Sequence, residues 1–85
     1  MSRTLHSKAY LEIIAWLKQS REDADLSMRD LAKALDVPHS YIGKVEQNER
    51  RLDVLEYFAY CEALGLKPEE GMKIIRRYRG KGGAL

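Results

Sequence analysis

The segment from residue 39 to residue 46 carries several side chains that are able to form hydrogen bonds, set around two aliphatic residues. Ile42 and Val45 are three positions apart, so they share one face if the segment is helical. Five other residues of the segment are polar, very small or amphipathic: His39, Ser40, Tyr41, Gly43 and Lys44. A lysine can donate to O6 and N7 of guanine, and a hydroxyl or an imidazole can bond a base edge or a phosphate. These residues are therefore candidates for contacts with nucleotide bases.

This segment is expected to be the second of two short helices that are joined by a tight turn. Ser27 followed by Asp30 is a variant capping box, which marks the start of the first helix. Asp36 lies where the chain reverses, and Asp tolerates the left-handed conformation that a tight turn needs. Proline suits the first turn of the second helix, because its missing N–H is no loss there. We predict helices over Met28–Leu35 and Pro38–Glu46. This is a helix-turn-helix, whose second helix commonly enters the DNA major groove.

Each polar residue of the second helix also has a plainer interpretation, as a solvated position on an amphipathic helix. Helical spacing places His39, Ser40, Gly43 and Lys44 together, opposite the aliphatic pair. Gly43 costs a helix about 1 kcal/mol relative to Ala, and closer approach to DNA is a plausible gain. For the four residues together, the helix-turn-helix context favours contact with a groove.

The stretch resembles the phage-repressor helix-turn-helix family, the xenobiotic-response-element or Cro type. That family has a Leu-Ala pair in the first motif helix, a Gly-like turn, and an Ile-x-x-Ile/Val-Glu ending in the second helix. The matching residues here are Leu31-Ala32, Asp36 and Ile42-Gly43-Lys44-Val45-Glu46. The likeness continues at Arg21-Glu22, Asn48-Glu49-Arg50-Arg51-Leu52-Asp53 and Ala63-Leu64-Gly65-Leu66. Each motif is weak alone, but their order and spacing are specific and span residues 8 to 72.

The resemblance implies contacts to the DNA backbone around the motif. Arg50 and Arg51 lie in a loop that the family sets along the sugar-phosphate backbone. Alternatively, they are solvated or pair with Glu49 and Asp53. The candidates near the first motif helix are Ser27, Met28, Arg29 and Lys33. Met28 stands where the family usually has a Gln that binds a phosphate, so only the helix N-terminus remains to do so there.

The resemblance also implies an ion pair between Arg21, near the end of the first helix, and Glu46, which closes the second motif helix. A buried pair of this kind specifies geometry more reliably than it adds stability. Asn48 replaces the usual Gly after the motif, a mild change because Asn also accepts the left-handed region.

The chain is expected to fold as an all-α, compact five-helix domain like that of lambda repressor. Outside the motif, helices are predicted over residues 7–20, 53–64 and 68–78. Tyr10 has the helical spacing of a core residue in the first of these. Asp53 with Glu56 would cap the second, and Gly65 would end it. The domain would span residues 7–79, with an N-terminal arm over 1–6 and a flexible tail over 80–85. The buried face of the fourth helix is expected to hold Val54, Tyr57, Phe58, Cys61 and Leu64.

Length and composition exclude several classes of protein. At 85 residues the chain has no room for a separate sensor or catalytic domain. One cysteine suits the reducing cytoplasm of a bacterial, archaeal or phage-infected cell. The apolar runs are too short for a transmembrane helix, and no signal-peptide pattern opens the chain. Histidine and cysteine lack metal-ligand spacing and no nucleophile motif is present, so we expect no metal, no cofactor and no enzyme.

The net charge of +2 is too small to identify a nucleic-acid binder. Residues 67–85 carry six basic and two acidic side chains, a local +4, so the rest of the chain sums to −2. A DNA-binding face must therefore be formed by a few well-placed cations and helix N-termini.

We expect a sequence-specific regulator that binds double-stranded DNA, most simply a repressor that occludes a promoter as a homodimer at a palindromic operator. The alternative from another class is an antitoxin that also neutralises a partner protein. A third is a motif retained for protein contacts, which Met28 favours. The dimer surface is expected at Leu66, Met72, Ile74, Ile75 and Tyr78, where apolar residues lie on more than one side of the last helix. Otherwise, Met72 and Ile75 only close the core, leaving Ile74 exposed.

Overall fold

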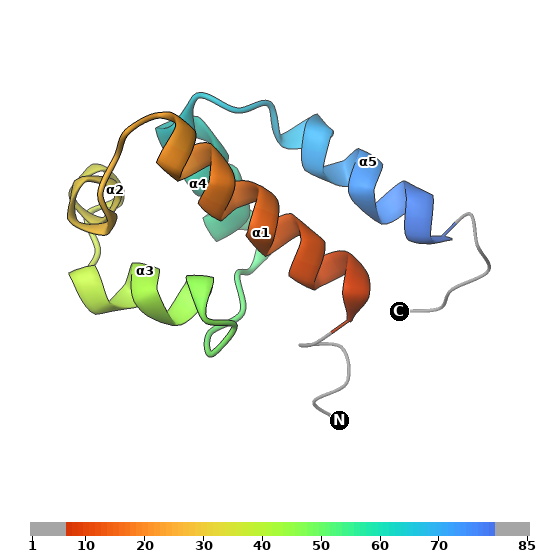
Figure 1. The fold of residues 1–85 in the computed structure, drawn as a ribbon, viewed down its shortest axis with the longest axis horizontal. Helices are drawn as coiled ribbons and strands as arrows, with labels where there is room; N and C mark the ends of the chain where they lie inside the picture. The colour runs from red at the N-terminus through yellow and green to blue at the C-terminus, as the bar shows by residue number, and fades with distance from the viewer. Residues whose placement is uncertain (1–6, 80–85) are drawn as a thin grey trace.

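The computed structural model describes residues 7–79, and within that range it contains five α-helices and no strand (Figure 1). In chain order the helices are α1 (Lys8–Asp23), α2 (Met28–Leu35), α3 (His39–Glu46), α4 (Val54–Leu64) and α5 (Pro68–Arg79). The predicted all-α, five-helix fold is confirmed. The arm and tail predicted for residues 1–6 and 80–85 lie outside the described residues. No helix in the described range is long and apolar enough to span a membrane.

The longest helix, α1, crosses the middle of the molecule and organises the others. It packs against α3, α4 and α5, while α2 packs against α3 and α4. In Figure 1, α2 and α3 lie at one end of the molecule, and α5 runs alongside α1 on the other side. The position of α3 therefore depends on two neighbours, α1 and α2.

One buried cluster, contributed by all five helices and the loop before α4, forms the core. Its members are Ile13, Ile14, Leu17, Leu31, Ala32, Ile42, Val45, Leu52, Tyr57, Tyr60, Cys61 and Ile74. The single cysteine is fully buried, and this burial raises the pKa of the Cys61 thiol. A buried thiol that is hard to ionise acts as a small apolar side chain.

The ends of α2 and α4 are set by the residues that the sequence marks. Ser27 Oγ accepts a hydrogen bond from the Asp30 amide at 3.0 Å, and the Asp30 carboxylate accepts from the Ser27 amide at 2.9 Å. Asp53 and Glu56 make the same reciprocal bonds, at 2.7 and 2.9 Å. These two capping boxes satisfy amides at the start of each helix. The residues that follow the two helices adopt the left-handed conformation: Asp36 and Gly65.

Several helix boundaries differ from the prediction by one to three residues, and two of these differences have a clear local cause. Helix α1 continues past Ser20 to Asp23, because the left-handed residue that ends it is Asp25, with φ 60°. The Asp25 amide bonds to the Glu22 carbonyl at 3.0 Å, which closes the last turn. Pro38 has extended backbone, with ψ 148°, and lies just before α3 as its N-cap instead of within its first turn.

The predicted buried face of α4 is only partly correct. Tyr57 and Cys61 are buried, but Val54 is 75% exposed and Phe58 is 50% exposed. The buried stripe runs through Tyr57, Tyr60 and Cys61, and Phe58 is one residue off it, rotated by about 100° around the helix. Val54 begins the helix and projects beyond the edge of the core. The prediction for Val54 and Phe58 is therefore wrong.

Helix α5 docks on α1 and α4 through a close approach at Gly71. A Cβ at Gly71 would overlap the Tyr57 hydroxyl and lie 3.0 Å from the Trp16 ring. That hydroxyl donates to the Pro68 carbonyl at 2.6 Å, at the start of α5. Near the other end, the Tyr78 hydroxyl and the Arg77 guanidinium each donate to Glu12 of α1 at 2.7 Å. The helix is held at both ends.

This docking changes the surface predicted for dimer formation. Ile74 is 7% exposed and belongs to the core, so its assignment to an exposed apolar surface is wrong, as is the alternative that leaves it exposed. Met72 is 44% exposed, and Leu66, Ile75 and Tyr78 are partly buried against the core. The rotation of α5 that seats Gly71 on Tyr57 also turns Ile74 inward, since the two residues are three apart.

Candidate nucleic-acid interface

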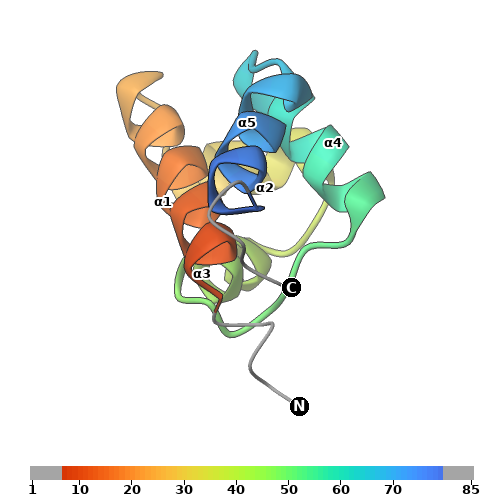
Figure 2. The same ribbon diagram turned by 90° about the vertical axis from the view of Figure 1, so that its right-hand side faces the viewer.

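Helix α3 has an anchored side and an exposed side. Ile42 and Val45 are almost completely buried, whereas His39, Ser40 and Lys44 are exposed. Around Gly43 the space is open, because a Cβ built there meets no atom within 4 Å. In Figure 2 the helix lies along the lower part of the molecule. Four of the five predicted base-contact residues therefore lie on or beside one accessible face.

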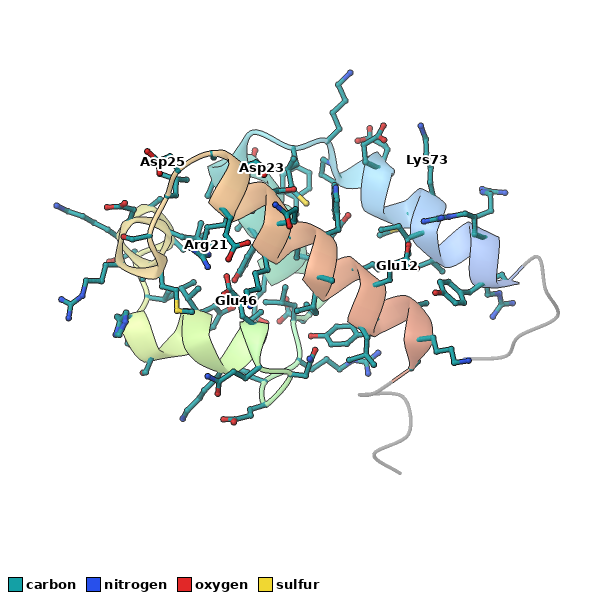
Figure 3. All side chains as sticks on the ribbon, in the orientation of Figure 1. Glu12, Arg21, Asp23, Asp25, Glu46 and Lys73 are labelled. Atoms are coloured by element: carbon teal, nitrogen blue, oxygen red, sulfur yellow. The ribbon has the colours of Figure 1, made fainter. Side chains whose placement is uncertain are left out.

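A buried ion pair fixes the angle of α3. Arg21 Nε donates to Glu46 Oε2 at 2.6 Å, and Nη2 donates to Oε1 at 3.1 Å. The two side chains are only 9% and 3% exposed and point toward each other between α1 and α3 (Figure 3). Arg21 Nη1 also donates to the Leu26 carbonyl at 2.7 Å, and the hydrogen bond to Glu46 raises the pKa of Arg21. The pair that the family resemblance implies is present and ties α1, the loop before α2, and α3 together.

The fifth predicted base-contact residue, Tyr41, does not share the exposed face. Its ring is half-buried and lies beneath the Arg50 guanidinium, whose carbon is 4.5 Å from the ring centroid. Burial, together with the nearby Glu56 carboxylate, raises the pKa of the Tyr41 phenol. Tyr41 thus faces the loop that follows α3 and the start of α4.

The adjacent arginines of that loop have different surroundings. Arg50 donates to both oxygens of Glu56, at 3.1 and 2.9 Å, so its partner is neither of the acids considered from the sequence. Arg51 lies over the ring of Tyr10 of α1, 4.9 Å from its centroid, and within residues 7–79 it has no ion pair. The charge of Arg50 is therefore compensated by Glu56, whereas no described residue pairs with that of Arg51.

The four candidate phosphate ligands near the start of α2 also differ in their surroundings. The Ser27 hydroxyl already accepts a bond in the capping box, and the Met28 side chain packs against the core. Arg29 and Lys33, one turn apart, are exposed. On α2, Arg29 and Lys33 are therefore the candidates whose charged side chains remain available to a phosphate.

A family model described as Helix-turn-helix matches residues 17–71 of the chain. This protein belongs to the helix-turn-helix family. Among solved structures, it is similar to an XRE-family like protein from Pseudomonas syringae pv. tomato str. DC3000. The two are 31% identical with a TM-score of 0.80, over 89% of this chain and 94% of that chain. No curated protein sequence matches the chain. The family suspected from the sequence is confirmed, and the protein is a DNA-binding transcription regulator of the XRE type.

In this helix-turn-helix protein, sequence reasoning missed two residues that support the interface. Glu56 was expected to cap α4 but not to hold Arg50, and Tyr10 was expected only in the core. The Tyr10 hydroxyl accepts a hydrogen bond from the Leu52 amide at 3.1 Å, 42 positions away in the chain. No periodicity predicts a contact between α1 and a loop so far along the sequence. Arg50 and Glu56 are six positions apart, with Arg50 in an irregular loop, so helical spacing does not predict their pairing either.

Proposed function

We propose that this protein is a repressor that binds a palindromic operator as a homodimer and reads bases with the exposed face of α3. The observation that supports base reading is the division of α3 itself. Its apolar side and Glu46 are locked into the fold, while His39, Ser40 and Lys44 stay free on a helix that is fixed in place. A rigid helix with exposed donors suits readout in a major groove.

Lys44 and Ser40 are proposed to contact base edges, and His39, at the first residue of α3, a base or a phosphate. Arg51, Arg29 and Lys33 are the proposed phosphate ligands, because their charges are exposed and lack ion pairs within residues 7–79. Backbone amides at the start of α2 can add a further phosphate contact.

A dimer is supported by an apolar patch that folding leaves uncovered. Val54 and Leu55 are 75% and 77% exposed, and Phe58 and Met72 lie nearby at 50% and 44%. Val54 and Met72 also line an open hollow of ≈ 230 Å³. The first turn of α4 lies at the side of the molecule, away from α3 at its lower edge (Figure 2). A second copy docked on this patch can present its own α3 to the same duplex.

The test begins with selection of bound sequences from a random duplex library by the wild-type protein. Lys44→Ala and Ser40→Ala should each weaken binding to the selected duplex by about 1–3 kcal/mol and relax the preference at particular base pairs. Arg51→Ala should weaken binding to all duplexes nearly equally. Retention of affinity and sequence preference in Lys44→Ala would show that α3 is not the reading element.

A further inference from the structure

The loop of residues 47–52, which joins α3 to α4, carries the two adjacent arginines. Arg50 is engaged on three sides. Its guanidinium donates to both Glu56 oxygens, donates to the Arg51 carbonyl at 3.2 Å, and lies over the Tyr41 ring. Its amide also donates to the Lys44 carbonyl at 3.2 Å. One side chain therefore connects α3, the loop and the first turn of α4.

This arrangement leaves Arg50 poorly suited to hold a phosphate. A bidentate bond to a carboxylate uses the same planar fork that would bind a phosphate, and the pair carries no net charge. The bond to Arg50 also lowers the pKa of Glu56, so the carboxylate stays ionised and the pair stays formed at neutral pH. To reach a phosphate, Arg50 would have to leave both Glu56 and Tyr41.

Arg51 is held differently. Its charge lies over the Tyr10 ring at 4.9 Å, and the next amide, that of Leu52, donates to the Tyr10 hydroxyl. Stacking on a ring orients a guanidinium without neutralising it. Two consecutive arginines with the same formal charge thus have different surroundings. Arg50 is paired with a carboxylate, whereas Arg51 is oriented on α1 and has no ion pair with any residue from 7 to 79.

We propose that Tyr41, Arg50 and Glu56 form a clamp that presets the loop, so that Arg51 meets the DNA phosphate and Arg50 itself does not. Arg50 is then a positioning residue. The inference rests on the proposed DNA-reading function and deepens it, because it assigns different roles to residues that sequence reasoning treats alike. An unclamped loop must be ordered during binding, and that ordering reduces affinity.

The slope of log affinity against log salt separates these roles, because each phosphate that the protein neutralises on duplex DNA contributes about 0.9 to the magnitude of that slope. The key variant is the charge-balanced pair Arg50→Gln with Glu56→Gln. It removes the ion pair without leaving a lone carboxylate, and Gln at position 56 still completes the capping box of α4. The matched control is Lys73→Gln with Glu70→Gln, an exposed pair at 3.2 Å on α5.

Binding is measured by fluorescence anisotropy with a selected duplex and with a mixed-sequence duplex of the same length, over a series of KCl concentrations. The clamp variant should bind about tenfold more weakly with an unchanged salt slope. Arg51→Gln should reduce the magnitude of the slope by about 0.9, and the control pair should change neither quantity. Without DNA, trypsin should cut after Arg51 faster in the clamp variant and in Tyr41→Leu than in wild type.

Each other outcome is decisive. A clamp variant whose slope falls as much as that of Arg51→Gln would make Arg50 a phosphate ligand and overturn the proposal. Wild-type affinity, slope and trypsin resistance in the clamp variant would also overturn it, by removing any role for Arg50. Arg50→Lys adds a check, because a phosphate ligand would tolerate lysine while a forked, stacked clamp would not. A wild-type protein that binds neither duplex would overturn the proposed function itself.

Discussion

Gly43 is the residue at which the demands of the fold and of DNA binding separate most clearly. It occupies the middle of an eight-residue helix, where glycine costs about 1 kcal/mol relative to alanine. No packing contact in the described part of the chain requires that choice, because a Cβ built there meets no atom of a neighbouring element within 4 Å. A glycine that the fold does not need is accounted for if the backbone of α3 approaches DNA closely.

We therefore predict that Gly43→Ala stabilises the protein and impairs its function. The free energy of unfolding should rise by about 1 kcal/mol, because alanine has the higher helix propensity. Affinity for a selected duplex should fall about tenfold, since the added methyl group would hold the helix away from the bases. Thermal unfolding and anisotropy titration measure the two effects. A variant that is more stable and binds as tightly as wild type would remove the close approach from the mechanism.

For single residues, the sequence predicts well what a side chain can do chemically, but it predicts poorly which other side chains surround it. The side chains of His39, Ser40 and Lys44 were assigned to an exposed face from spacing alone, and they lie there. Arg50 and Arg51 could not be distinguished, because both are arginines in a loop without periodicity. Their difference comes from Glu56 and Tyr10, which lie on other elements and reach the loop only after the helices have packed.

At the element scale, the docking of α5 depends on another glycine in the opposite situation. A Cβ at Gly71 would overlap the Tyr57 hydroxyl, which donates to the Pro68 carbonyl at 2.6 Å. Burial raises the pKa of Tyr57, which keeps this hydroxyl protonated as a donor. The contact joins α4 to α5 at the point where α5 begins.

We predict that Gly71→Ala lowers the free energy of unfolding by about 1–3 kcal/mol, because the gain in helix propensity of about 1 kcal/mol offsets only part of the cost. Overpacking costs about 1–3 kcal/mol, and loss of the Tyr57 bond adds about 1 kcal/mol. Gly43→Ala is the matched control, because the same substitution in open space should stabilise. Urea denaturation compares them. The proposed overlap predicts partial rescue by Tyr57→Phe in the Gly71→Ala background, and absence of rescue would place the cost elsewhere.

Helix positions were predicted to within one to three residues, because caps and turns are local signals. The boxes at Ser27 and Asp53 and the left-handed turns at Asp36 and Gly65 all lie where the sequence marks them. Faces were predicted less well where a helix is apolar on two sides. Helix α4 has a buried stripe through Tyr57 and an exposed one through Leu55 and Phe58, and spacing alone cannot rank them. The packing of α1, α2 and α5 decides which stripe is covered.

At the scale of the whole molecule, the exposed stripe of α4 raises the question of a second copy. A single domain offers one eight-residue helix to DNA, whereas a two-fold dimer places two such helices about 34–36 Å apart, one turn of the duplex. The patch of Val54, Leu55, Phe58 and Met72 belongs to α4 and α5 and includes no residue of α3, which leaves the reading face free. Contiguous exposed apolar side chains on a protein surface commonly mark an interface.

We predict that Leu55→Glu with Phe58→Glu yields a folded monomer with weakened operator binding. Both side chains are at least half exposed, so the substitutions leave the core intact, while four buried carboxylates would prevent two copies from meeting. Affinity for a palindromic duplex should fall at least about a hundredfold, since the second reader is lost. Sedimentation velocity and anisotropy measure the two effects, and Ala15→Glu, on an exposed position of α1, is the control. A wild-type protein that sediments as a monomer and binds its site as one copy would contradict the dimer.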